Sequence, residues 1–215
     1  MSVRLKICGV ANERDAQEAA HLGADALGIP MDGAPGSVTP EEAVQLALRL
    51  PPLLTCVAVF RRTTPARTVR AAAAEARIRV VQIGEDSGMA PASQGDPARI
   101  VSIGAGRASD AARLGRIPAA ALRLALSPPS AGARELPPDW TCARGAARVC
   151  RVVIGGLADP AALAEAIGYV RPYGVDLLEG CEYTPGQLDV DRLEALAVSA
   201  RTATALLESE RVWSR

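Results

Sequence analysis

Several features that mark other classes of protein are missing from this sequence. No apolar run approaches the ~20 residues that a membrane-spanning helix needs. The opening residues 1–6 have neither the long apolar core nor the small-residue cleavage site of a signal peptide. We therefore expect a cytoplasmic protein without a membrane partner.

Charge of one sign is not in excess either. Lys plus Arg and Asp plus Glu amount to 24 each, so the formal net charge is zero and no positive field attracts a polyanion. Lys6 is the only lysine, and the abundance of arginine and alanine is typical of biased genomic composition rather than of an arginine-rich binding surface. We expect no nucleic-acid partner.

Patterns for metal ligation and disulfide bonding are absent as well. No C-x-x-C pair occurs, and the single histidine, His21, lies in a stretch of helical periodicity. We expect no metal, no cofactor, and thiols that stay buried and reduced. The cysteines, odd in number, are Cys8, Cys56, Cys142, Cys150 and Cys181.

What the sequence does contain is a repeated unit of strand followed by helix. Short runs of Val, Ile and Leu alternate with Ala/Leu/Glu/Arg stretches of helical periodicity, such as residues 41–50, 66–76 and 160–170. This alternation is typical of a parallel sheet covered by helices. We expect strands near residues 3–8, 24–30, 53–60, 78–83, 99–104, 121–127, 149–154 and 174–178.

Eight such units predict an α/β fold, a (β/α)8 TIM barrel forming a single domain over residues 1–215. A doubly wound open sheet is the alternative, disfavoured because no G-x-G-x-x-G follows the first strand. Segments 84–95 and 128–139 are rich in Gly, Pro, Ser and Ala. They follow strands, where we expect either mobile lids or irregular insertions.

Capping residues mark the expected helix starts. Thr39 precedes a proline and stands three positions before Glu42, which predicts a capping box. Asn12 is expected to cap the first helix. Asp96 and Asp159, each followed by proline, follow the same pattern and predict two further helix starts.

The chain also carries a specific set of motifs. It opens with L-K-I-C-G-V at residues 5–10 and G-A-D-A-L-G at 23–28, and continues with G-G-L at 155–157 and R-P-Y-G-V-D at 171–176. These motifs are similar to those of the phosphoribosylanthranilate isomerase family, and the likeness spans nearly the whole chain. The resemblance implies a (β/α)8 barrel and an Amadori rearrangement in tryptophan biosynthesis.

The resemblance assigns the role of general base to Cys8. Family members open an N-phosphoribosyl-aniline ring with a general acid and then move a proton from C2 with a cysteine thiolate. Cys8 ends an apolar strand, which places it at the catalytic rim of a barrel. Such a thiol needs nearby positive charge or N–H groups to draw its pKa toward neutrality. The alternative is a packed core cysteine.

Two of the family's functional groups have no counterpart here. The acid is an aspartate at the end of the sixth strand, yet residues 122–128 hold no carboxylate, and losing an acid lowers a rate by about 10²–10⁴. The arginine that binds the substrate carboxylate aligns with Gly36. Arg61 and Arg62 follow the third strand and supply a replacement anion site, or else form a solvated pair.

The phosphate site is altered too. Gly155 and Gly156 are kept, but the family's Ser-Ser-Gly becomes Leu178-Glu179-Gly180. A carboxylate ~4 Å from a phosphate charge costs about 1–4 kcal/mol, so Glu179 disfavours a phosphorylated ligand unless it points away. Gln82 stands in the segment where the family has a histidine.

These departures lead to three hypotheses. The first is a repurposed isomerase that acts on a small, unphosphorylated metabolite, such as one of a secondary pathway, with Cys8 as base and Glu179, Asp32 or Glu85 as acid. The second is a genuine phosphoribosylanthranilate isomerase with a rebuilt site, and the third is a non-catalytic barrel that binds a metabolite or a partner. We expect a small-molecule substrate, a monomer or homodimer, and a binding site comprising Arg61, Arg62, Gln82, Gly155, Gly156 and Gly180.

Overall fold

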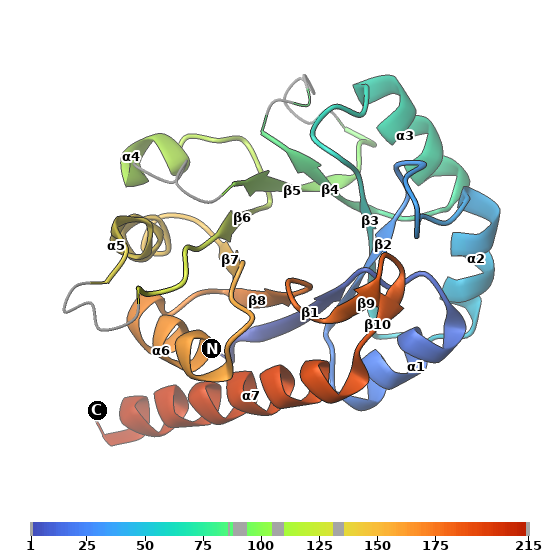
Figure 1. Cartoon of the computed structure of the whole chain (residues 1–215). Helices are drawn as coiled ribbons and strands as arrows, with labels where there is room; N and C mark the ends of the chain where they lie inside the picture. The colour runs from blue at the N-terminus through green and yellow to red at the C-terminus, as the bar shows by residue number, and fades with distance from the viewer. Residues whose placement is uncertain (1, 86, 88–93, 105–109, 131–135, 214–215) are drawn as a thin grey trace.

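A closed barrel of eight parallel strands forms the body of the molecule (Figure 1). The computed structural model describes residues 2–85, 87, 94–104, 110–130 and 136–213. Each strand is hydrogen-bonded to the next, and the last pairs with the first, so the sheet has no free edge. The predicted (β/α)8 fold is confirmed. The strands are β1 (Arg4–Cys8), β2 (Ala26–Pro30), β3 (Thr55–Val59), β4 (Val80–Gly84), β5 (Ala98–Ile103), β6 (Ala121–Ala125), β7 (Val152–Gly155) and β8 (Gly174–Leu177).

Helices surround the barrel, and a small hairpin follows β8 (Figure 1). The hairpin consists of β9 (Glu182–Thr184) and β10 (Gln187–Leu188), which pair antiparallel. In the described part of the chain, no helix is both long enough and apolar enough to cross a membrane. The helices are α1 (Glu13–His21), α2 (Pro40–Leu48), α3 (Ala66–Glu75), α4 (Ala111–Leu114), α5 (Pro138–Ala146), α6 (Pro160–Val170) and α7 (Val190–Trp213).

Three of the four predicted helix starts are confirmed. Thr39 forms a complete capping box at α2, and the Asn12 and Asp159 side chains accept hydrogen bonds from the first turns of α1 and α6. The prediction for Asp96 is wrong, because β5 begins two residues later. A proline suits the start of a strand as well as the start of a helix, and the Asp96 carboxylate instead accepts a hydrogen bond from Arg70 at 3.1 Å.

The two segments expected to be lids or insertions fall partly outside the described residues, which exclude 86, 88–93 and 131–135. Their character stays a prediction. So does the assignment of residues 1–215 to a single domain.

Charged side chains enter the barrel because residues alternate along each strand. Leu5 and Ile7 of β1 belong to the apolar core, whereas Lys6 and Cys8 point to the opposite face, which is the barrel interior. In β6, Arg123 lies between two leucines of the core and likewise points inward. The barrel interior therefore contains charged side chains, although the strands that carry them are otherwise mostly apolar.

Candidate active site

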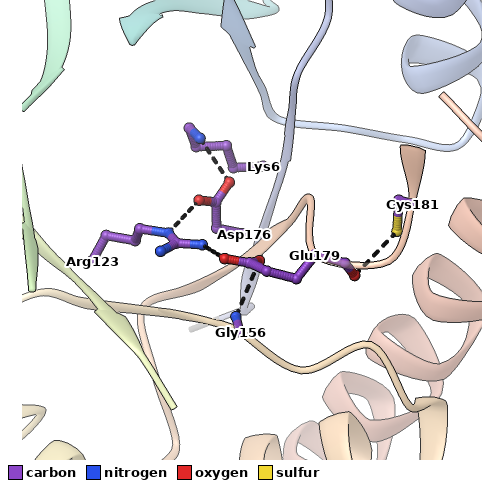
Figure 2. Close-up of polar contacts among 6 residues, drawn as sticks. All are labelled: Lys6, Arg123, Gly156, Asp176, Glu179 and Cys181. Carbon is purple, nitrogen blue, oxygen red and sulfur yellow. Dashed lines mark hydrogen bonds and ion pairs between the residues drawn. The ribbon is translucent and has the colours of Figure 1, made fainter. Parts of the chain in front are cut away.

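Three charged side chains meet inside the barrel (Figure 2). Lys6 of β1 and Asp176 of β8 are register partners, and Lys6 Nζ lies 2.6 Å from Asp176 Oδ1. Arg123 of β6 reaches the other carboxylate oxygen, with Nε 2.7 Å from Oδ2. The Asp176 side chain is 0% exposed, so it has no solvent contact and depends on these two cations.

The ion pairs decide the charge state of this cluster. Burial works against the charge on Asp176, but the attraction of Lys6 and Arg123 outweighs it and holds the pKa of that carboxyl below its ordinary value. Burial also opposes the charge on Lys6, yet its attraction to Asp176 and Cys8 leaves the pKa of the ammonium above its ordinary value. All three groups are ionised at neutral pH.

Cys8 lies beside this cluster at the C-terminal end of β1. It is a register partner of Gly28 in β2, and a Cβ at position 28 would lie 2.5 Å from Cys8 Sγ and 2.8 Å from Lys6 Nζ. Glycine is required there because thiol and ammonium fill the space.

The pKa of the Cys8 thiol is raised, first by burial and further by Asp176, although Lys6 acts to lower it. The positive charge expected near the thiol is present, but burial outweighs its effect. Without a ligand, the thiol is therefore protonated at neutral pH.

Glu179 extends this network toward the loop after β7 (Figure 2). One of its carboxylate oxygens accepts a short hydrogen bond from Arg123, and the other accepts one from the Gly156 N–H at 3.1 Å. Gly155 makes room for this contact, because a Cβ there would lie 2.7 Å from an Arg123 nitrogen. Glu179 therefore points into the rim between β7 and β8. Gly180 follows with φ of +75°, a conformation that favours glycine.

The other residues predicted to bind substrate come from β4 and from the loop after β3. Arg61 is 61% exposed, and its Nε lies 2.8 Å from Asp32 Oδ2. Arg62 packs its stem against Gly84. Gln82 is buried in β4, and its Oε1 has no hydrogen-bond partner among the residues that the structure describes.

The loop after β2 leaves no room for a side chain at Gly36. Gly36 has φ of +80°, and a Cβ there would lie 2.5 Å from the backbone of Pro185. No larger side chain fits that position without moving the β9–β10 hairpin. In the same loop, Asp32 accepts hydrogen bonds from the Ala34 N–H at 3.1 Å and from Ser37 Oγ at 2.7 Å, and it also pairs with Arg61. These contacts hold the Asp32 carboxylate in the loop, and its role as an acid stays a prediction.

One carboxylate does lie at the end of β6, although it comes from α5. Asp139 is buried, and its Oδ2 accepts a hydrogen bond from the Ser127 N–H at 2.7 Å. Trp140, the next residue along, donates from its indole nitrogen to the Ser127 carbonyl at 2.9 Å. Asp139 Oδ1 has no hydrogen-bond partner in the described part of the chain. Sequence comparison of the strand alone misses this residue, because it is brought there by the following helix.

Two cavities border the barrel interior. One of about 210 Å³ opens at the C-terminal rim, and its lining includes Arg62, Glu85 and Arg123. Glu85 there pairs closely with Arg113. A larger cavity of about 450 Å³ opens at the N-terminal ends of the strands, and Lys6 is among the residues that line it. Catalytic groups of this fold lie at the C-terminal rim, so we place the candidate site there.

Similarity to known proteins identifies the family. No family model matches the chain. A protein named N-(5'-phosphoribosyl)anthranilate isomerase from Geobacter sulfurreducens is 35% identical over 196 residues, which cover 89% of this chain and 95% of that protein. The chain belongs to the phosphoribosylanthranilate isomerase family. The solved structure of phosphoribosyl anthranilate isomerase from Thermus thermophilus has the same barrel. It matches this chain with a TM-score of 0.74 and 29% identity, and the match covers 93% of this chain and 99% of that one.

Another solved phosphoribosyl anthranilate isomerase is described as a complex with reduced 1-(o-carboxyphenylamino)-1-deoxyribulose 5-phosphate. It is 24% identical to this chain, with TM-score 0.73 and coverage of 93% and 99%, and this likeness shows the fold. Among the described residues, no group of three or more His, Cys, Asp or Glu is placed to hold a metal ion.

Proposed function

We propose that this chain catalyses the isomerisation of N-(5'-phosphoribosyl)anthranilate, with Cys8 as the general base. The observation that carries the proposal is the position of Cys8 next to Lys6 and Asp176, at the C-terminal end of β1, in a chain of this family. Relatives with that name match almost the whole chain, which favours this activity over a repurposed one. The corresponding pathway is tryptophan biosynthesis.

The proposed reaction rearranges bonds without gaining or losing atoms. A proton on the ring oxygen lets the C1–O bond break, while the nitrogen lone pair forms a C1=N bond. The base then removes the proton from C2, and the electron pair shifts to give an enolamine. The enolamine becomes the ketone when C1 gains a proton and the hydroxyl on C2 loses one. The positive charge of Lys6 lowers the pKa of Cys8 against the larger effect of burial, so the base and its counter-charge come from the same strand.

The acid step requires a carboxylate from outside β6. Glu179 is one of three carboxylates predicted as the acid, with Asp32 and Glu85. Its role stays a prediction, because both of its oxygens accept hydrogen bonds in this structure. Asp139 is the second candidate, since its carboxylate lies at the end of β6 with one oxygen unpartnered among the described residues. Turnover by Glu179→Gln and Asp139→Asn variants distinguishes the two, because removing the acid lowers the rate by about 10²–10⁴.

The second candidate function is a related isomerisation of a substrate without phosphate. The contact of Glu179 with Arg123 and with the Gly156 N–H favours it, since a carboxylate then occupies the rim where barrels of this kind often bind phosphate. Arg61, Arg62 and Gln82 remain proposed contacts for the rest of either substrate. A cytoplasmic location and a monomeric or homodimeric state remain predictions.

The two candidates differ in their response to a phosphate group. Purified protein is supplied with N-(5'-phosphoribosyl)anthranilate and, separately, with the ribosyl compound that lacks phosphate, and product is quantified by chromatography. The first proposal predicts a higher kcat/KM for the phosphorylated compound. A higher kcat/KM for the unphosphorylated one supports the repurposed enzyme, and no turnover of either contradicts both. Complementation of a tryptophan auxotroph that lacks the isomerase gives an independent check.

A further inference from the structure

Glu179 differs from the other charged members of the network in its exposure to solvent. Its side chain is 36% exposed and follows β8, whereas that of Arg123 is 11% exposed and that of Asp176 is 0% exposed. Arg123 would keep its bond to Asp176 if Glu179 turned toward solvent. The network therefore contains one partly exposed anion, Glu179, beside the buried pair of Arg123 and Asp176.

The net charge of the network determines which ligands it would attract. Lys6 and Arg123 are balanced by Asp176 and Glu179, so the network is neutral as it stands. Without Glu179 it carries one net positive charge, and the Arg123 guanidinium and the Gly156 N–H lose the acceptor they now share. An arginine beside a backbone N–H is a common arrangement for binding phosphate or carboxylate groups.

We propose that Arg123 and the Gly156 N–H form an anion subsite, and that the Glu179 carboxylate occupies it as an internal competitor which the phosphate of a ligand must displace. The inference rests on the proposed function, because it concerns the rim that would hold the substrate. A site that is open only part of the time binds its ligand with an apparent affinity reduced by the open fraction. Glu179 thus sets how strongly this barrel discriminates against phosphorylated ligands.

A purely structural role for Glu179 makes a different prediction. If the carboxylate only anchors Arg123, removing it lowers stability and leaves the affinity for anions unchanged. If it competes, removing it raises that affinity. Direct binding of inorganic phosphate separates the two roles, and it requires neither substrate nor turnover.

The experiment compares wild-type protein with Glu179→Ser and Glu179→Gln by titration with inorganic phosphate at neutral pH and low ionic strength. The serine variant empties the subsite, and the glutamine variant keeps the size of the side chain but removes its charge. Glu165→Gln is the matched control, since Glu165 is exposed on α6 and the substitution changes the net charge equally. Circular dichroism verifies that each variant is folded.

We expect Glu179→Ser to bind phosphate at least about tenfold more tightly than wild type, equivalent to about 1.4 kcal/mol. Glu179→Gln gains in the same direction, and Glu165→Gln matches wild type. The inference is overturned if either Glu179 variant stays within about twofold of wild type, or if the control gains as much. Failure of turnover with a clear gain in phosphate affinity rejects only the proposed function, whereas turnover without that gain rejects only the inference.

Discussion

Replacing Asp176 by asparagine tests whether the buried network is held together as described. The substitution keeps the shape of the side chain but removes the charge that bridges Lys6 and Arg123. Lys6, with a side chain 6% exposed, then keeps its charge without an anionic partner. Removing one partner of a buried ion pair costs about 3–5 kcal/mol, a large part of the roughly 5–15 kcal/mol that stabilises a typical domain. At about 2–4 °C per kcal/mol, Tm should fall by about 6–20 °C.

The pH dependence of this loss follows from the shifted pKa values. The lowered pKa of Asp176 gives stability that is present above the pKa of an unfolded aspartate and disappears as the pH falls. The raised pKa of Lys6 gives stability that is present below the pKa of an unfolded lysine and disappears as the pH rises. The difference between wild type and Asp176→Asn should therefore be largest at neutral pH and shrink below about pH 4 and above about pH 10.

Urea denaturation of wild type and Asp176→Asn across this pH range measures the difference. Glu210→Gln serves as the control, because Glu210 pairs with Arg171 at the surface, where the side chains are 61% and 51% exposed. Exposed pairs contribute about 0–1 kcal/mol, so the control should lose little. A loss for Asp176→Asn no larger than that of the control would refute the account of the network.

Three further predictions concern the thiol and the end of β6. Gly28→Ala pushes a methyl group against Cys8 and Lys6 and should lower the free energy of unfolding by about 1–3 kcal/mol. The control Gly168→Ala, in an open position of α6, should raise that free energy by about 0.5–1 kcal/mol. Equal effects of the two variants in thermal melts would contradict the described packing around Gly28. Alkylation of Cys8, measured by mass spectrometry, should be slow at neutral pH, because burial raises the pKa of this thiol. The pH at which the reaction becomes fast should be higher than for an ordinary thiol. Fast reaction at neutral pH would show that the pKa is shifted in the opposite direction. Asp139→Asn should lower kcat by about 10²–10⁴ with little change in KM if this carboxylate is the acid, and unchanged kcat removes it from the mechanism.

Local signals explain why most of the barrel is predictable from sequence. An apolar run marks β1, and the Asp159 cap with its following proline marks the start of α6, so both elements lie where they were expected. Such signals depend on neighbouring residues alone. They fail at Asp96, where an Asp-Pro dipeptide precedes a strand instead of a helix. They also do not predict the short β9–β10 hairpin.

The site is less predictable because its contacts join distant parts of the chain. Arg123 and Asp176 are 53 positions apart, and their pairing depends on which face of each strand is turned inward. A charged residue in the middle of an apolar strand is the local signal that marks Arg123, but it does not identify Asp176 as the partner. The direction of Glu179 follows from the loops after β7 and β8, whose geometry no local pattern encodes. Asp139 reaches the end of β6 only through the packing of α5.

The most direct test of the account is the turnover of N-(5'-phosphoribosyl)anthranilate by wild type and by Cys8→Ser, with Cys142→Ser as a control for a cysteine that lies on α5. We predict that wild type and the control form the aminoketose product, and that Cys8→Ser, although folded, loses that activity. Product formation by Cys8→Ser at the wild-type rate, or none by folded wild type, would contradict the account.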